Sequence, residues 1–221
     1  MINLEYDVLC KTEITKEQFA SYALTAKNYL EKLFGNLDNL DSCEVEIFDI
    51  SKWGGGCVTG RYIPGRNKIE LPYHYSEDEF LDTLVHEMNH QVLHDRIQNP
   101  PRWFSEGLAQ YHSVFNRKVI IGNIKLDKLL EIKSAADESN LISLEDLVIK
   151  NKGFDGCTTS LAYAESWSFV HFLMNQGIFA HLVGKYTLTC SYIDHSEIRC
   201  LESKWIDYLN EIFKIAIRGV N

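Results

Sequence analysis

The strongest constraint on the fold is one helical segment, residues 77 to 96, whose two sides differ sharply in chemistry. Ser76 with Glu79 is a capping-box pattern that begins the helix. At 100° per residue the apolar side chains form one stripe, made of Leu81, Leu84, Val85, Met88 and Val92. His86 and His90 fall close together on the opposite side. The helix is therefore expected to bury one side and to offer two imidazoles on the other.

These two histidines belong to the pentapeptide His86-Glu87-Met88-Asn89-His90, which has the HExxH spacing of a metal-binding helix. Histidines four residues apart are separated by one turn, so both can reach a single ion at about 2.0 to 2.1 Å. Glu87 lies beside them, where a carboxylate can polarise a water on the metal and later pass a proton to a leaving amine. The pattern predicts His86 and His90 as metal ligands and Glu87 as a general base.

The third ligand is not obvious from spacing alone. His94 extends the series, but it lies about 12 Å along the helix axis from His86, whereas ligand atoms on one ion must lie within roughly 4 Å of each other. Glu106 is a better candidate, because Asn99-Pro100 breaks the motif helix and a tight turn could bring the next helix back toward the histidines. From position alone, an exposed helical acid is the default interpretation of Glu106.

Strand patterns come before most of the helical ones. Residues 2 to 8 alternate between apolar and polar side chains, and residues 43 to 50 are rich in β-formers. Residues 57 to 63 and 67 to 71 flank Pro64-Gly65, which suits the centre of a type II turn and predicts a hairpin.

Helical patterns dominate the rest of the chain. We expect helices near residues 16–34, 77–96, 101–115, 126–133, 143–150, 160–176 and 196–214. Gly107 would permit close helix approach, with Trp103 and Leu108 packing the motif helix against the next one. This order predicts an α+β fold in a single domain, residues 1–221. Its first lobe, 1–98, holds the sheet and the motif helix, and its second, 99–221, is helical.

Composition limits the classes of molecule that the protein is expected to bind and the compartment expected for it. The chain carries 31 acidic against 22 basic side chains, a net charge of -9, which disfavours nucleic acid and anionic lipid surfaces. The first residues lack the basic and apolar parts of a secretory signal, and no apolar run approaches the roughly 20 residues of a membrane span. The six cysteines form no CxxC pair. We therefore expect a cytoplasmic protein with reduced, mostly buried thiols, and no nucleic-acid or membrane partner.

Together, HEMNH and PRWFSEGLAQY resemble the gluzincin zinc metallopeptidases, most closely the peptidase MA-like family, over residues 80 to 115. In that family a short connection leads from HExxH to a W-x-x-E-G-x-A motif, matched here by Trp103, Glu106, Gly107 and Ala109. The resemblance implies a zincin-like fold with an N-terminal mixed sheet, an edge hairpin, an active-site helix and a mainly helical C-terminal part.

The same resemblance implies the composition of the site. One Zn²⁺ ion would be held by His86, His90 and Glu106, with Glu87 as the general base. Residues 161 to 170 are similar to a later helix of the family, where a Y-A-x-S pattern recurs. There Tyr163 could donate a hydrogen bond to the oxyanion, and Glu165 could brace a histidine through its second nitrogen. A packing or surface role is the alternative for both side chains.

The resemblance further implies that one strand of the hairpin lies at the sheet edge beside the cleft. A peptide could add there as an antiparallel strand. The residues of this expected substrate-binding strand are Asn67, Lys68, Ile69, Glu70 and Leu71.

The favoured function is peptide-bond hydrolysis by metal-activated water, with a peptide or protein as substrate. The alternative is a non-catalytic zinc-binding interaction or regulatory domain that keeps the zincin fold. A nucleic-acid-associated protease is disfavoured by the acidic balance. The substrate sequence, the choice between endo and exo attack and the oligomeric state are left open by the sequence.

Overall fold

The computed structural model describes residues 15–37, 43–48, 60–73, 76–97, 99–115, 120–121, 124–179 and 194–220. The chain forms two compact units. The first comprises Met1–Asn99 and His112–Asn116, and the second comprises Pro100–Tyr111 and Arg117–Asn221. The strand expected at residues 2 to 8 lies outside the described residues.

The first unit begins with helix α1 (Lys16–Phe34), which matches the predicted range. Its start is fixed by a capping box: Gln18 N donates to Thr15 Oγ1 at 3.2 Å, and Thr15 N donates to Gln18 Oε1 at 2.8 Å. Gly35 follows the helix with φ 79°, a conformation that costs glycine little.

A three-stranded mixed sheet lies in the same unit. Its strands are β1 (Glu44–Phe48), β2 (Arg61–Ile63) and β3 (Lys68–Pro72), in the order β1-β3-β2. β1 runs parallel to β3, and β2 runs antiparallel to it. The predicted hairpin is therefore confirmed as β2–β3. The expectation that residues 67–71 form the sheet edge is wrong, because β3 is the central strand and β2 is an edge strand of the described sheet.

The connection between β2 and β3 also differs from its prediction. Pro64–Arg66 form one turn of 3₁₀-helix, labelled η2, instead of a type II turn. The left-handed residue is Asn67, with φ 45°, and Gly65 has no positive φ. Asparagine tolerates a positive φ better than most residues, so Asn67 can adopt the left-handed conformation that a type II turn would have required of Gly65.

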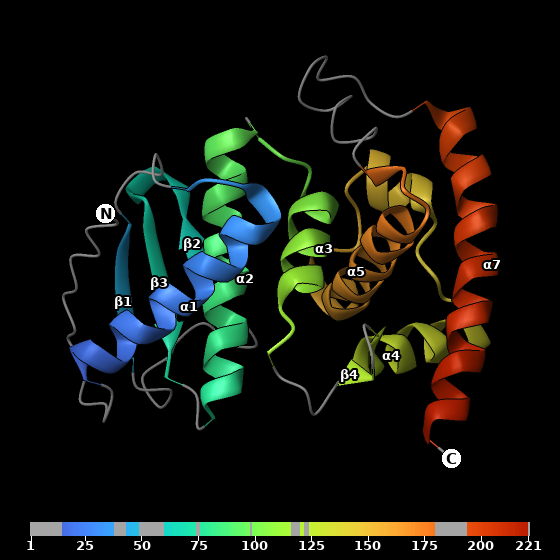
Figure 1. Ribbon diagram of the computed structural model, residues 1–221. Coiled ribbons are helices and arrows are strands. Elements are labelled where there is room, and N and C mark those ends of the chain that lie inside the picture. The colour runs from blue at the N-terminus through green and yellow to red at the C-terminus, as the bar shows by residue number, and fades with distance from the viewer. Residues whose placement is uncertain are drawn as a thin grey trace. The chain divides into compact units, whose positions relative to one another are not determined.

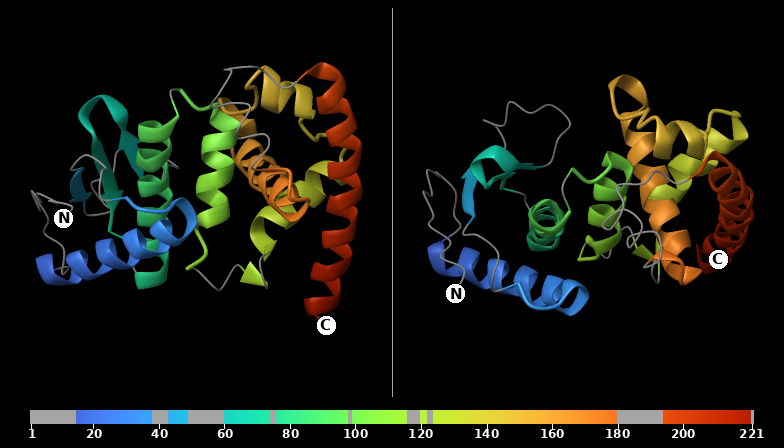
Figure 2. Two further views of the ribbon diagram at one scale, coloured as in Figure 1. Left: turned by 45° about the horizontal axis from the view of Figure 1, so that its top comes forward. Right: turned by 90° about the horizontal axis from the view of Figure 1, so that it is seen from above.

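Helix α2 (Glu77–Arg96) also matches its predicted range, and Ser76 Oγ accepts from Glu79 N at its start. Most of its apolar stripe belongs to the core of the first unit. In that unit α2 packs against α1 and against strands β2 and β3 (Figures 1 and 2). Burying such side chains contributes roughly 1.5 to 3 kcal/mol each. Large members of this core, all almost fully buried, are Phe19, Leu30, Ile47, Ile69, Leu71, Phe80 and Leu84.

The second unit contains most of helix α3 (Arg102–His112) and all the later elements. Strands β4 (Ile120–Ile121) and β5 (Ile124–Lys125) pair antiparallel ahead of helix α4 (Leu126–Asp137). A π-helical turn, η4 (Glu145–Ile149), and a 3₁₀ turn, η5 (Gly156–Thr158), precede helices α5 (Thr159–Asn175) and α7 (His195–Val220). Helix α5 packs against both α4 and α7 (Figure 1).

Helix boundaries in this unit follow the predictions with some differences. Helix α4 continues past the predicted end at residue 133, and α3 ends before the predicted residue 115. Gly177 follows α5 with φ 67°, and its N–H donates to Met174 O, as is typical of a glycine at the end of a helix.

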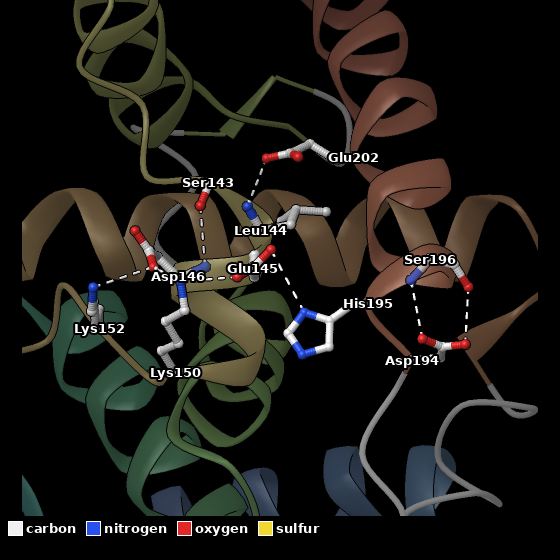
Figure 3. Close-up of polar contacts among 10 residues, drawn as sticks. All are labelled: Ser143, Leu144, Glu145, Asp146, Lys150, Lys152, Asp194, His195, Ser196 and Glu202. Atoms are coloured by element: carbon white, nitrogen blue, oxygen red, sulfur yellow. Dashed lines mark hydrogen bonds and ion pairs between the residues drawn. The ribbon is translucent and has the colours of Figure 1, made fainter.

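Polar contacts attach η4 to α7 (Figure 3). Leu144 N donates to Glu202 Oε1 at 2.8 Å, and His195 Nδ1 lies 3.6 Å from Glu145 Oε2. Deeper in the unit, Trp205 Nε1 donates to Ser168 Oγ at 3.1 Å, which joins α7 to α5.

Two further expectations concern cysteines and membranes. Cys43 is a buried free thiol, as predicted for most cysteines, whereas Cys200 is free and exposed. Among the helices that the structure describes, none has the length and apolar character needed to cross a membrane.

Candidate functional site

The side chains of His86 and His90 converge from successive turns of α2. Their Nε2 atoms lie 3.1 Å apart, and both residues are half-buried. Two nitrogen atoms bound to one tetrahedral zinc ion at 2.0 to 2.1 Å would be about 3.3 Å apart. The pair therefore already has the separation that one small cation requires of two ligands.

The carboxylate of Glu87 is almost fully buried, with 4% of the residue exposed. It lies beside Gly60, which immediately precedes strand β2. A methyl group added to Gly60 would stand 3.0 Å from Glu87 Oε1 and 2.8 Å from Thr83 Cγ2. A larger residue at position 60 would have to displace one of these side chains, so glycine keeps the start of β2 against the carboxylate.

A buried polar pair lies on another side of α2. Asn89 Nδ2 is 2.9 Å from His112 Nδ1, and the two residues are 0% and 2% exposed. Burial lowers the pKa of His112 to about 4, so the imidazole is neutral near pH 7 and its Nδ1 can accept from the amide. Phe115 N also donates to Asp82. These two contacts hold residues 112–115 to α2 within the first unit.

Glu106, the expected third ligand, lies on α3 in the second unit and is half-buried. Arg102 is one turn earlier on the same helix, and its Nη2 donates to Tyr163 OH at 3.4 Å. Burial acts to lower the pKa of Arg102, but the hydrogen bond with Tyr163 and the charges of Tyr163, Glu106 and Asp155 outweigh it, so the pKa is raised. Arg102 thus has two predicted site residues of this unit, Glu106 and Tyr163, among its electrostatic neighbours.

Gly107 explains how closely α3 lies against α5. A methyl group added there would stand 2.5 Å from the backbone oxygen of Ser166. Trp103 contacts Phe169 of α5, with ring centroids 5.3 Å apart. The close helix approach predicted for Gly107 is therefore real, but its described partner is α5 and not the motif helix.

The contacts that the structure gives Glu165 differ from the histidine contact expected for it. Glu165 is 0% exposed. Its Oε1 accepts from Ile142 N at 3.0 Å, and its Oε2 has no hydrogen-bond partner in the described structure. Burial raises its pKa to about 8, with help from the charges of Glu202 and Glu131. Residues two apart on a helix point about 200° apart. Tyr163 contacts Arg102, whereas the buried carboxylate of Glu165 faces the interior of its unit and accepts there from Ile142 N.

The side chains of the expected substrate-binding strand already contact other residues of the first unit. Ile69 and Leu71 belong to the core, and Tyr62 OH donates to Asn67 Oδ1 at 3.0 Å. Lys68 forms ion pairs with Glu44 and Glu46, and Glu70 pairs with Arg61 at 2.5 Å. With β1 on one side and β2 on the other, residues 68–70 have no open edge for a peptide.

Sequence reasoning missed two residues of this region. Gly60 could have been found, since an isolated glycine inside a strand pattern often marks a close backbone approach. Arg102 had no such signal, because its contact with Tyr163 joins residues 61 positions apart.

Comparisons with known proteins give one family similarity. Residues 81–187 match the model of a family described as a protein of unknown function, DUF1570. The matched range contains the histidine pair, Glu106 and Tyr163. Comparison with curated proteins gave no match, and comparison with solved structures gave none either.

Proposed function

We propose that this protein is a zinc-dependent peptide-bond hydrolase in which His86, His90 and Glu106 hold one Zn²⁺ ion and Glu87 is the general base. The observation that carries the proposal is the convergence of the two Nε2 atoms, 3.1 Å apart, beside a buried carboxylate on the same helix. Without a metal, the same contact is a hydrogen bond between the two imidazoles, so metal content is what separates the two interpretations.

The donor set supports zinc. His86, His90 and Glu106 form a group of side chains that could hold a metal ion. Two imidazoles and one carboxylate suit zinc and leave a fourth coordination position for water, as in catalytic sites. When bound, zinc would act as a Lewis acid and lower the pKa of a water ligand to about 7.

The protein side chains would handle the protons. Glu87 would take a proton from the attacking water and deliver it to the leaving amine. Its burial and the contact with Gly60 limit the positions that the carboxylate can adopt. Tyr163 would donate a hydrogen bond to the oxyanion that develops on the scissile carbonyl, and the contact with Arg102 would hold its hydroxyl group in place.

The structure of the sheet changes the proposed substrate position. A peptide or protein substrate would add along β2, an edge strand of the described sheet that directly follows Gly60 beside Glu87. Backbone hydrogen bonds to Arg61–Ile63 would then bring a scissile bond toward the general base.

The test compares the wild type with Glu87→Gln for zinc content and for cleavage of a mixed peptide library followed by mass spectrometry. We expect one zinc per chain in both, with cleavage reduced by roughly 10²- to 10⁴-fold in the variant. Asp95→Asn, which changes an exposed acid on the same helix, is the matched control and should cleave like the wild type. Full zinc occupancy without cleavage by the wild type would support the alternative, a non-catalytic zinc-binding domain.

A further inference from the structure

The guanidinium group of Arg102 is held in a defined position within the second unit. Its Cζ lies 5.1 Å from the centroid of the Phe154 ring, and its Nη2 donates to Tyr163 OH at 3.4 Å. A cation over an aromatic face is attracted by the ring, and the contact leaves the edges of the guanidinium open for hydrogen bonds. Phe154 and Tyr163 therefore fix the position of the charge without neutralising it, while the carboxylates that act on it are those of Glu106 and Asp155.

The ion pair of Arg102 within its unit is weak. Nη1 lies 3.5 Å from Oδ1 of Asp155, whose side chain is 100% exposed, while 40% of the Arg102 side chain is exposed. Exposed pairs of this kind contribute little. The hydrogen bonds of Arg102 to described residues are the ones to Asp155 and Tyr163, at 3.5 and 3.4 Å. Since a guanidinium group has five N–H donors, most of them have no protein acceptor in the described structure.

We propose that Arg102 determines substrate specificity by binding a carboxylate group of the substrate next to Tyr163. This inference rests on the proposed hydrolase function, because it assumes that Tyr163 faces the scissile bond. The planar fork of arginine matches the two oxygens of a carboxylate, which lysine cannot match. In a chain of net charge -9, a fixed and accessible cation beside the proposed oxyanion donor would favour anionic over neutral substrates.

The carboxylate has two possible sources, the C-terminus of a peptide or an acidic side chain. A charge-assisted hydrogen bond to a charged group corresponds to about 10- to 100-fold in binding. We therefore expect the wild type to prefer one carboxylate-bearing peptide class over its amide counterpart by a factor in this range. Arg102→Gln should abolish that preference, and Arg102→Lys should retain only part of it.

Four mixed-sequence pentapeptide libraries distinguish the sources. The first two contain no acidic side chains and end in a free carboxylate or in a carboxamide. The other two end in a carboxamide and contain one Asp or one Asn. Cleavage rates are measured with the wild-type and Arg102 variants, and retention of each library is measured on zinc-loaded proteins that also carry Glu87→Gln. Arg199→Gln, an exposed arginine on α7, is the matched control and should keep the preference.

The two readouts separate failure of this inference from failure of the proposed function. A wild-type protein that retains carboxylate peptides selectively but cleaves none supports the assignment of Arg102 while refuting the hydrolase. Equal retention of acid and amide libraries by the Glu87→Gln protein overturns the assignment, whether or not the wild type cleaves them. The assignment is also overturned when Arg102→Gln keeps the preference, or when it weakens neutral and acidic peptides equally, as loss of Tyr163 positioning alone would cause.

Discussion

Replacing Glu165 with glutamine should stabilise the protein at alkaline pH. The Glu165 residue is 0% exposed, and its Oε2 has no hydrogen-bond partner in the described structure. Among the described residues of α4 and α7, two acids, Glu202 and Glu131, act on it by their charge, and both disfavour its ionised form. Glutamine has the same shape, keeps an oxygen for Ile142 N and carries no charge at any pH.

The sign of the effect follows from the raised pKa. Burial moves the pKa of Glu165 from 4.5 to about 8, so the unfolded chain loses this proton at lower pH than the folded chain does. Between these two values the folded state binds more protons, and stability falls as pH rises. This difference in pKa lowers the free energy of unfolding by roughly 5 kcal/mol above pH 8. About 4 kcal/mol of that loss occurs between pH 5 and pH 9.

The assay is urea unfolding of the wild type and Glu165→Gln at pH 5 and pH 9, with the free energy of unfolding extrapolated to water. The free energy of unfolding of the variant, relative to that of the wild type, should rise by about 4 kcal/mol from pH 5 to pH 9. Glu211→Gln, which removes an exposed acid on α7, should track the wild type at both pH values. A difference between wild type and Glu165→Gln that is the same at pH 5 and pH 9 would refute the reasoning.

Three further predictions concern other buried contacts. Because burial lowers the pKa of His112 from 6.5 to about 4, acidification across this range should cost about 3 kcal/mol of stability, and His112→Gln should remove that dependence in urea unfolding. Gly60→Ala should retain zinc but lose at least about tenfold in kcat, since the new methyl group would stand 3.0 Å from Glu87 Oε1; unchanged kcat would count against this placement. Gly107→Ala should destabilise the protein by about 1 to 3 kcal/mol in urea unfolding, because its methyl group would stand 2.5 Å from Ser166 O, and a neutral effect would contradict the close contact.

Local patterns in the sequence predicted the helices of the first unit well. Helix α1 follows from a capping box, an apolar repeat and a glycine stop, which all act within a few residues of one another. The convergence of His86 and His90 follows from helical spacing alone. These features depend on short-range geometry, which a single sequence carries directly.

Long-range pairing could not be predicted in the same way. The hairpin pattern identifies β2 and β3 as neighbours, but nothing local indicates that β1 pairs in parallel along the other side of β3. That pairing makes β3 the central strand and moves the proposed peptide position to β2. The predicted type of turn at Pro64–Arg66 was also wrong, because Asn67 adopts the left-handed conformation that glycine more commonly takes.

Side-chain direction limited the prediction of the helical unit. Tyr163 and Glu165 were both expected at the site, yet two positions on one helix that differ by about 200° cannot face the same region. Tyr163 contacts Arg102, whereas Glu165 binds Ile142 N in the interior. A choice between the two faces requires knowing which side of α5 packs against α3, and Gly107 and Trp103 reveal it only through the contacts of the folded unit.

X-ray absorption at the zinc edge tests most directly whether His86 and His90 hold a catalytic zinc ion. With one equivalent of zinc, the wild type should give a site of nitrogen and oxygen ligands only, with two imidazoles at about 2.0 to 2.1 Å and an exchangeable water. His90→Ala should lose one imidazole, and Glu106→Ala should lose one oxygen ligand without losing an imidazole. A spectrum with zinc–sulfur distances near 2.3 Å, or one that both variants leave unchanged, would contradict the account.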